Sequence, residues 1–109
     1  MISFNDYQIL AHSTAIYPRE RGLEYTILGL VGEAGELANH YKKVIRDNNG
    51  ILHEEKRQKL AKELGDCLWY IASVAEELHF DLEDIAERNL AKLAKRAEKG
   101  TLSGSGDER

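Results

Sequence analysis

Apolar residues recur at helical spacing in four stretches of the chain. The first runs over 4–14, the second and longest over 23–46, the third over 60–78 and the fourth over 82–97. The segment 47–50, Asp-Asn-Asn-Gly, separates the second stretch from the third and is a strong turn signal, since Asn and Gly tolerate positive φ. The pattern therefore predicts four helices joined by short loops.

Short loops place successive helices side by side, so we predict an all-α fold, a four-helix antiparallel bundle. Ser3 and Asp81 precede the first and fourth repeats and are N-cap candidates. With 109 residues there is room for one domain, which we place at 1–99, and the aperiodic residues 100–109 are expected to form a flexible tail. Small helical domains gain buried area by association, so we expect a homodimer or homotetramer.

Charge and cysteine content narrow the functional classes. The net charge is −4 and the 15 basic residues are scattered, which argues against a nucleic-acid polymer as partner. The single Cys67 excludes an internal disulfide and suits a reducing compartment. No apolar run approaches the roughly 20 residues that a bilayer span requires. We expect a soluble, cytoplasmic protein without a membrane partner.

Two pairs of acidic residues stand at helical spacing on the second and third predicted helices. Glu33 and Glu36 are three residues apart, as are Glu63 and Asp66, so each pair shares a helix face. At about 100° per residue, both pairs are displaced from their apolar stripes in the same rotational sense. If the two helices pack antiparallel with their stripes facing, all four acids lie on one side and at nearly the same level.

Clustered carboxylates must bind protons or cations. Two anions about 5 Å apart repel by about 3 kcal/mol at an effective dielectric constant near 20. Hard oxygen ligands suit Mg²⁺, or Mn²⁺ as an alternative, and both ions keep positions open for water and phosphate. The competing interpretation is two solvated acidic faces without a ligand.

Four glycines flank the acids within helix interiors. Each of them, Gly29, Gly32, Gly35 and Gly65, lowers helix stability by about 1 kcal/mol relative to Ala. A packing or binding interaction must therefore offset this loss of helix stability. Their small size permits close approach of a neighbouring helix or of a ligand, and the sequence is consistent with both explanations.

The segments 29–38 and 62–70 resemble the MazG-type all-α nucleotide pyrophosphohydrolases, whose signature is Glu-x-x-Glu followed after a spacer by Glu-x-x-Asp. The resemblance covers nearly the whole chain. It implies Mg²⁺-dependent cleavage of a nucleoside triphosphate, (d)NTP, to the monophosphate and pyrophosphate, in housekeeping of the nucleotide pool. It also implies that one glutamate of the first pair positions or deprotonates the attacking water, and that the metal ligands are Glu33, Glu36, Glu63 and Asp66.

The fourth predicted helix carries a segment that resembles the family's Asn-x-x-Lys motif. Asn89 falls near the centre of the apolar stripe, where a polar side chain needs a partner, and Lys92 and Arg96 follow it. The resemblance implies substrate binding by these three; the alternative is a buried Asn beside two solvated cations. Tyr70 lies on the flank of Asp66, where a base could stack on it.

Two other functions compete with hydrolysis. A di-metal redox bundle needs Glu-x-x-His from two helices, and only 76–79 has that spacing, although His40 follows Glu36 by four residues and could lie beside a metal. A non-catalytic helical interaction module would use the acids as a solvated ridge. That module predicts no effect of Mg²⁺ on stability.

Overall fold

The computed structural model describes residues 1–109, which form four α-helices and one short 3-10 helix, without strands. The predicted all-α class and the four helices are confirmed. None of the helices is both long and apolar enough to cross a membrane. The elements in chain order are α1 (Phe4–His12), η1 (Arg19–Arg21), α2 (Gly22–Asn48), α3 (Glu54–Glu77) and α4 (Leu82–Lys99).

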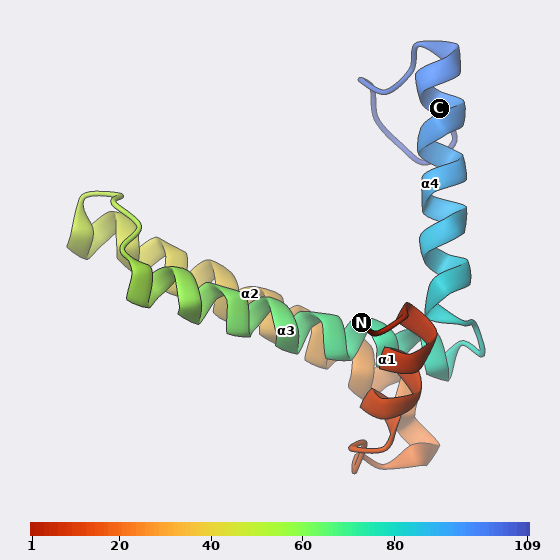
Figure 1. The fold of residues 1–109 in the computed structure, drawn as a ribbon, viewed down its shortest axis with the longest axis horizontal. Coiled ribbons are helices and arrows are strands. Elements are labelled where there is room, and N and C mark those ends of the chain that lie inside the picture. Colours follow the sequence, from red (N-terminus) through yellow and green to blue (C-terminus); the bar gives the residue numbers. More distant parts are fainter.

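Helices α2 and α3 form a long antiparallel hairpin, which Figure 1 shows running across the molecule. Asn49 ends α2 in the left-handed conformation with φ 55°, and Gly50 follows with φ 74°. The backbone N–H of Gly50 donates to the carbonyl of Val44 at 3.2 Å. The predicted turn is confirmed, and its residues supply the positive φ angles that the reversal requires.

The starts of α1 and α4 are capped in different ways. The Ser3 hydroxyl accepts the backbone N–H of Asp6 at 3.0 Å, as predicted. Asp81 occupies the N-cap position of α4 but makes no capping hydrogen bond. Gln8 Oε1 instead accepts the N–H of Leu82 at 2.8 Å, so α1 caps α4 from 74 residues away in sequence.

The best-packed part of the molecule is the corner where α1, α3 and α4 meet. Ala11, Ala72 and Leu82 form the buried cluster, against which Tyr7 and Trp69 pack. The buried Gln8 also donates to the Glu76 carboxylate at 3.2 Å and to the Phe80 carbonyl at 2.9 Å. This corner fixes where α4 begins and in which direction it leaves.

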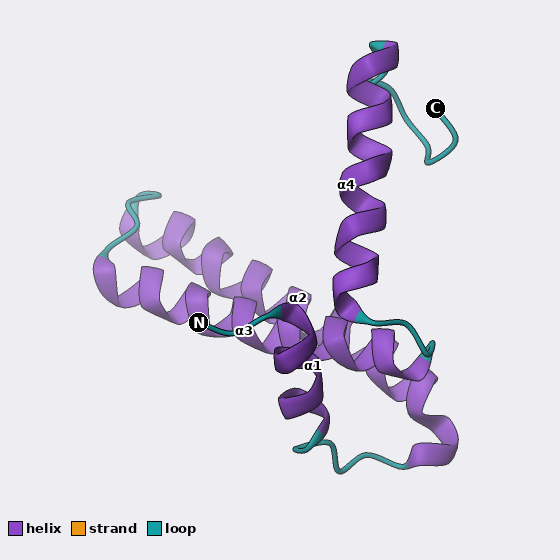
Figure 2. Ribbon diagram, turned by 45° about the vertical axis from the view of Figure 1, so that its right-hand side comes forward, coloured by secondary structure: helices purple, strands orange, loops and turns teal.

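Helix α4 runs away from the hairpin, contacting α1 and α3 near the corner but not α2 (Figures 1 and 2). Within one chain, α4 therefore does not pack along the α2–α3 hairpin as it would in a closed bundle of four. The radius of gyration is 16.8 Å, against about 13 Å for a compact domain of this length. Accessible surface is 8000 Å², against about 6,100 Å² for a compact monomer of this mass. The chain leaves much surface uncovered.

The line of contact between α2 and α3 follows only one edge of the apolar stripes, so the condition that the stripes face each other is met only in part. Fully buried Thr26 and Val44 belong to the contacting side of α2, where Gly22 approaches Glu77 and Gly29 approaches Tyr70. The stripes are instead largely exposed, and we call their exposed members the apolar face. Away from the helix ends, these are Ile27, Val31, Tyr41 and Ile45 of α2 with Leu64, Leu68 and Ile71 of α3.

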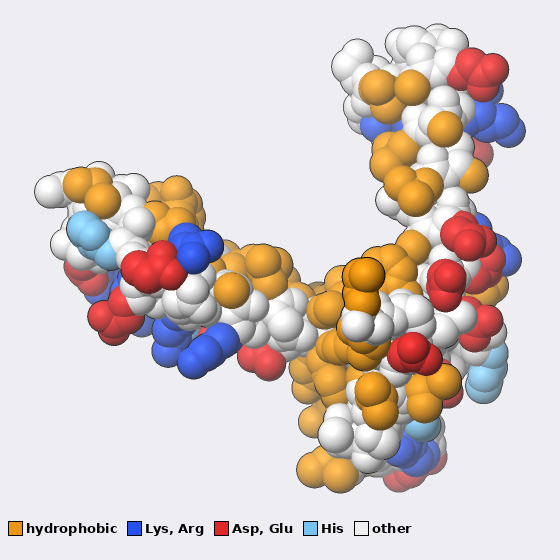
Figure 3. Space-filling view, viewed as in Figure 1, with side chains coloured by type: hydrophobic (Ala, Val, Ile, Leu, Met, Phe, Trp, Pro, Cys, Tyr) orange, Lys and Arg blue, Asp and Glu red, His pale blue; other side chains and the backbone are white.

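The apolar face lies on one side of the hairpin. At about 100° per residue, the residues of the apolar face are rotated away from the α2–α3 contact line in the same sense on both helices. In an antiparallel pair, residues rotated in the same sense lie on the same side of the pair. Figure 3 shows apolar side chains gathered along the hairpin and along α4. The spacing of Ile27, Val31, Tyr41 and Ile45 fits a heptad seam, the pattern with which one helix pair packs on another.

Candidate metal centre

Three carboxylates from the two long helices meet in the hairpin. Glu33 of α2 and Glu63 and Asp66 of α3 each offer one oxygen, and these oxygens lie within 4.8 Å of one another. The structure thus brings together three of the four acids that the sequence singled out. Glu33 and Glu63 are half-buried, and Asp66 is exposed. Three hard oxygen donors at this separation, open to solvent on one side, fit a Mg²⁺ or Mn²⁺ ion.

Glu36 stands one turn along α2 from Glu33 and joins this group through His40. The His40 Nε2 lies 3.4 Å from Glu63 Oε1 and 3.9 Å from Glu36 Oε2. The longer distance exceeds a hydrogen bond and represents charge proximity when the imidazole is protonated. His40 therefore lies beside the carboxylates, as its spacing from Glu36 indicated, while the Glu36 side chain stays 58% exposed.

Two groups at the cluster, Glu33 and Cys67, have raised pKa values. Burial, followed by the charges of Asp66, Glu63 and Glu36, raises the pKa of Glu33. Burial, followed by the charge of Glu33, also raises the pKa of the Cys67 thiol. Each of these groups is thus disfavoured in its anionic form, and a bound cation would offset the part of that penalty that comes from the neighbouring charges.

The glycines divide between the two explanations that the sequence left open. A Cβ on Gly29 would collide with the Tyr70 ring, so this glycine permits close contact between α2 and α3. A Cβ on Gly32, Gly35 or Gly65 would meet nothing within 4 Å. Helix packing within the chain does not explain these three, and they leave room beside the acids for a ligand or a second subunit.

A polar hollow of about 490 Å³ adjoins Glu63 and Asp66. It is also lined by Lys59 and Lys62, which the sequence reasoning did not single out. The available signal was their helical spacing, because Lys59 stands four residues before Glu63 and Lys62 four before Asp66. Ammonium groups beside a carboxylate cluster suit a ligand that carries both phosphates and a metal ion.

Tyr70 lies next to the carboxylates. Its ring covers Gly29 and makes an edge-to-face contact with Trp69, with centroids 5.0 Å apart. Burial, followed by Tyr25 and then by the charges of Glu33 and Asp66, raises the pKa of the Tyr70 phenol. The half-buried ring stands four residues, one helical turn, after Asp66, on the flank predicted from the sequence.

The residues predicted on the fourth helix are not brought to the carboxylates of their own chain. Glu63 stands 14 residues before the end of α3, about 21 Å from the corner at which α4 departs. Asn89 is exposed, so the alternative of a buried Asn is not realised within one chain, because no helix of the same chain covers that side of α4. Lys92 and Arg96 contact Asp107 instead.

The Glu-x-x-His spacing at 76–79 does not form a second metal site of the redox type. His79 lies beyond the end of α3 with φ 62°, and Glu76 accepts a hydrogen bond from Gln8. The ligand pattern of a di-metal redox bundle is not assembled there.

The chain is thus an all-α protein with an acidic cluster between two antiparallel helices. Residues 21–101 match the MazG nucleotide pyrophosphohydrolase domain, and the chain belongs to this family. It is 48% identical to the Gene 37 protein of Mycobacterium phage L5, over 94% of this chain and 96% of that protein. No solved structure matches it.

The raised pKa of Glu33 predicts a pH-dependent stability that magnesium counteracts. Because the folded state holds this proton more tightly than the unfolded chain, Glu33 stabilises the fold fully below its ordinary pKa of 4.5, and the contribution is lost as pH rises through the folded-state pKa. In EDTA, calorimetry should therefore show the melting temperature of the wild type falling with pH relative to that of Glu33→Gln. At neutral pH, magnesium at 100 times its Kd should raise the free energy of unfolding by about 2.7 kcal/mol. Identical melting temperatures with and without magnesium would contradict a metal site.

Proposed function

We propose that this protein is a Mg²⁺-dependent nucleotide pyrophosphohydrolase that cleaves a (d)NTP to the (d)NMP and pyrophosphate, in the cytoplasm and as part of nucleotide-pool housekeeping. The observation that carries the proposal is the convergence of the Glu33, Glu63 and Asp66 oxygens within 4.8 Å, in a chain of the MazG family. Mg²⁺, or Mn²⁺ in its place, is the ion that we assign to these carboxylates and to Glu36.

Each acidic residue has a role in this proposal. Glu33, Glu63 and Asp66 hold the metal from both helices of the hairpin, and a bound Mg²⁺ neutralises phosphate charge and acidifies a coordinated water. Glu36 stands outside the group of three and is 58% exposed, so besides a place as the outer metal ligand we assign to it the positioning of the attacking water and acceptance of its proton. The water oxygen attacks the α-phosphorus, the bond to the bridging oxygen breaks, and pyrophosphate leaves.

The substrate-binding residues come from two helices. We assign Tyr70, whose ring lies near Asp66, to stacking on the base, and Lys59 and Lys62 add positive charge at the hollow. Asn89, Lys92 and Arg96 bind the phosphates in this proposal. Because their own chain holds them away from the carboxylates, we assign them to the site of a neighbouring copy.

A homodimer or homotetramer provides that copy. The surface in excess of a compact monomer is about 1,900 Å², more than the roughly 800 Å² that each partner buries in a stable interface. The apolar face of the hairpin is the surface that we assign to the second copy, since its heptad spacing suits helix-pair packing.

A product assay tests the activity. The protein is incubated with canonical, deoxy and damaged nucleoside triphosphates, with magnesium or with EDTA, and pyrophosphate and orthophosphate are measured separately. We expect pyrophosphate as the first product, in magnesium only. Orthophosphate as the first product would contradict attack at the α-phosphorus, whereas no product from any nucleotide would favour the non-catalytic interaction module with an acidic ridge.

A further inference from the structure

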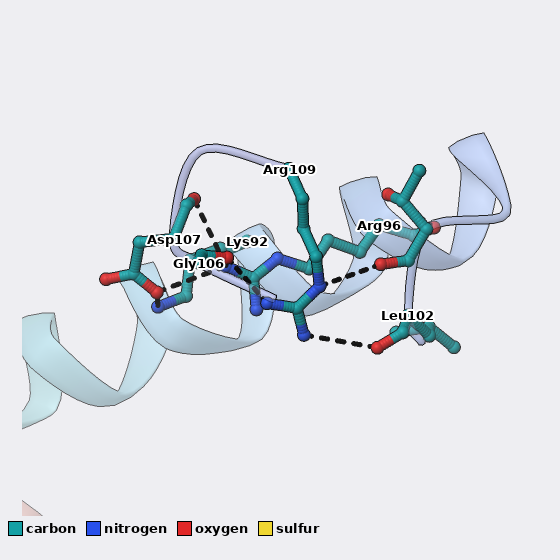
Figure 4. Close-up of polar contacts among 7 residues, drawn as sticks. Lys92, Arg96, Leu102, Gly106, Asp107 and Arg109 are labelled. Atoms are coloured by element: carbon teal, nitrogen blue, oxygen red, sulfur yellow. Dashed lines mark hydrogen bonds and ion pairs between the residues drawn. The ribbon is translucent and has the colours of Figure 1, made fainter. Parts of the chain in front are cut away.

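The C-terminal segment after α4 folds back along that helix and is closed by Arg109. Figure 4 shows the guanidinium of Arg109 reaching the carbonyls of residues that precede it in the segment. Arg109 donates to the carbonyl of Thr101 at 2.9 Å, to that of Leu102 at 3.1 Å and to that of Gly106 at 2.6 Å. These three hydrogen bonds shape the segment into a loop that presents the side chain of Asp107 to α4.

Asp107 is held by two cations of α4. Its Oδ1 lies 2.9 Å from Lys92 Nζ and 3.1 Å from Arg96 Nη2, so one oxygen bridges both side chains (Figure 4). These two partners lower the pKa of the Asp107 carboxyl, which keeps it ionised. The carboxylate therefore occupies the two cations that the proposed function assigns to substrate phosphates.

Arg96 carries hydrogen-bonding capacity that the loop does not fill. Its side chain is only 7% exposed, yet its Nε has no hydrogen-bond partner. The contact with Asp107 uses one nitrogen of a group that can pair with two oxygens of an anion at once. A phosphate group, with three terminal oxygens, can bridge Lys92 and Arg96 as Asp107 does and also supply an acceptor for a second nitrogen.

We propose that Asp107 is an internal stand-in for a phosphate group, so that the folded C-terminal segment competes with the phosphates of a nucleotide or of pyrophosphate for Lys92 and Arg96. The proposal rests on the proposed function in that those two cations bind substrate phosphates. In the closed state the segment masks the phosphate site. Arg96 Nη2 also contacts the carbonyl of Gly106 at 3.4 Å and that of Asp107 at 3.1 Å. Ligand binding displaces the Asp107 carboxylate together with these two carbonyls, and the loop, closed by Arg109, moves away from α4.

Competition of this kind has a quantitative consequence. The apparent Kd equals the intrinsic Kd divided by the fraction of molecules whose segment is open. If the segment is closed in about 70–90% of molecules, removing the Asp107 charge tightens phosphate binding by about three- to tenfold. Loss of this contact should increase affinity, whereas loss of a residue that merely orients Lys92 and Arg96 should decrease it.

Calorimetric titration of the full-length protein with pyrophosphate in EDTA tests the inference. We expect Asp107→Asn to bind about three- to tenfold more tightly than the wild type, and Lys92→Ala to abolish the gain when combined with it. Glu108→Gln is the matched control, since it removes the same charge from the neighbouring exposed residue, and it should leave the affinity unchanged. A parallel titration with a non-hydrolysable nucleoside triphosphate analogue shows which phosphoanion the site prefers.

Three results would overturn the inference: equal affinity of Asp107→Asn and the wild type, weaker binding by the variant, or an equal gain in Glu108→Gln. The last would reveal a general charge effect. Because the titration needs neither metal nor turnover, its outcome is separate from the product assay. A protein that hydrolyses no nucleotide can still show the competition, and an active enzyme can still lack it.

Discussion

Replacing Asp66 with Asn is expected to lower the rate of pyrophosphate release by about 10²–10³-fold in saturating magnesium. The substitution keeps the size of the side chain and removes one of three converging anionic oxygens, so the metal loses a charged ligand where phosphate charge must be neutralised. Asp66 is exposed and its removal relieves repulsion with Glu33. The melting temperature in EDTA should therefore be unchanged or higher, which separates loss of function from unfolding.

Glu55→Gln is the control for this variant. Glu55 lines the same polar hollow but lies outside the three-carboxylate group. The control should keep the pyrophosphate release of the wild type, whereas full activity in Asp66→Asn would show that the carboxylate group does not hold the catalytic metal. Circular dichroism of both variants checks that helix content is preserved.

Placing a charge on the apolar face is expected to dissociate the proposed homodimer or homotetramer. Val31 is 66% exposed and Leu64 is 57% exposed in the single chain, so glutamate at either position is tolerated by a monomer. In a self-complementary interface each substitution is present twice, and burying an unpaired carboxylate there costs several kcal/mol. We expect Val31→Glu and Leu64→Glu to weaken self-association at least about 100-fold, equivalent to about 2.7 kcal/mol.

Light scattering coupled to size-exclusion chromatography measures this change. Ile51→Glu is the matched control, because Ile51 is as exposed as Leu64, at 57%, but lies in the loop between α2 and α3. The monomeric variants should also lose pyrophosphate release although all four acids are intact, since we assign Lys92 and Arg96 to the site of a neighbouring copy. Active monomers would refute that assignment, and a monomeric wild type would refute the interface.

The sequence predicted the elements and the acidic cluster because both depend on local geometry. The turn at 47–50 needed only residues that tolerate positive φ, and the meeting of Glu33 with Glu63 and Asp66 followed from angular offsets on two antiparallel helices. The proximity of His40 followed from one helical turn. The inference about the acids survives the imperfect facing of the stripes, because equal offsets in the same sense fall on one side of an antiparallel pair.

What the sequence did not reveal depended on the partner that covers each surface. An apolar stripe shows that a helix face needs cover, but not whether its own chain supplies it. The α2–α3 contact therefore takes in only one edge of the stripes, and Asn89 is exposed on an α4 that leaves the hairpin. The capping of α4 by Gln8 joins residues far apart in sequence, and no local pattern marks such a pair.

Through the side-chain amide of Gln8, α1 is part of the structure that positions α4. The family match begins at residue 21, after α1, yet Gln8 supplies the acceptor for the opening turn of α4, and Ala11 covers Ala72. A chain trimmed to the matched residues keeps all four acids of the proposed metal site and loses the Gln8 acceptor that anchors the first turn of α4. The part of the chain that sets the direction of the helix bearing Lys92 and Arg96 therefore starts before the matched residues.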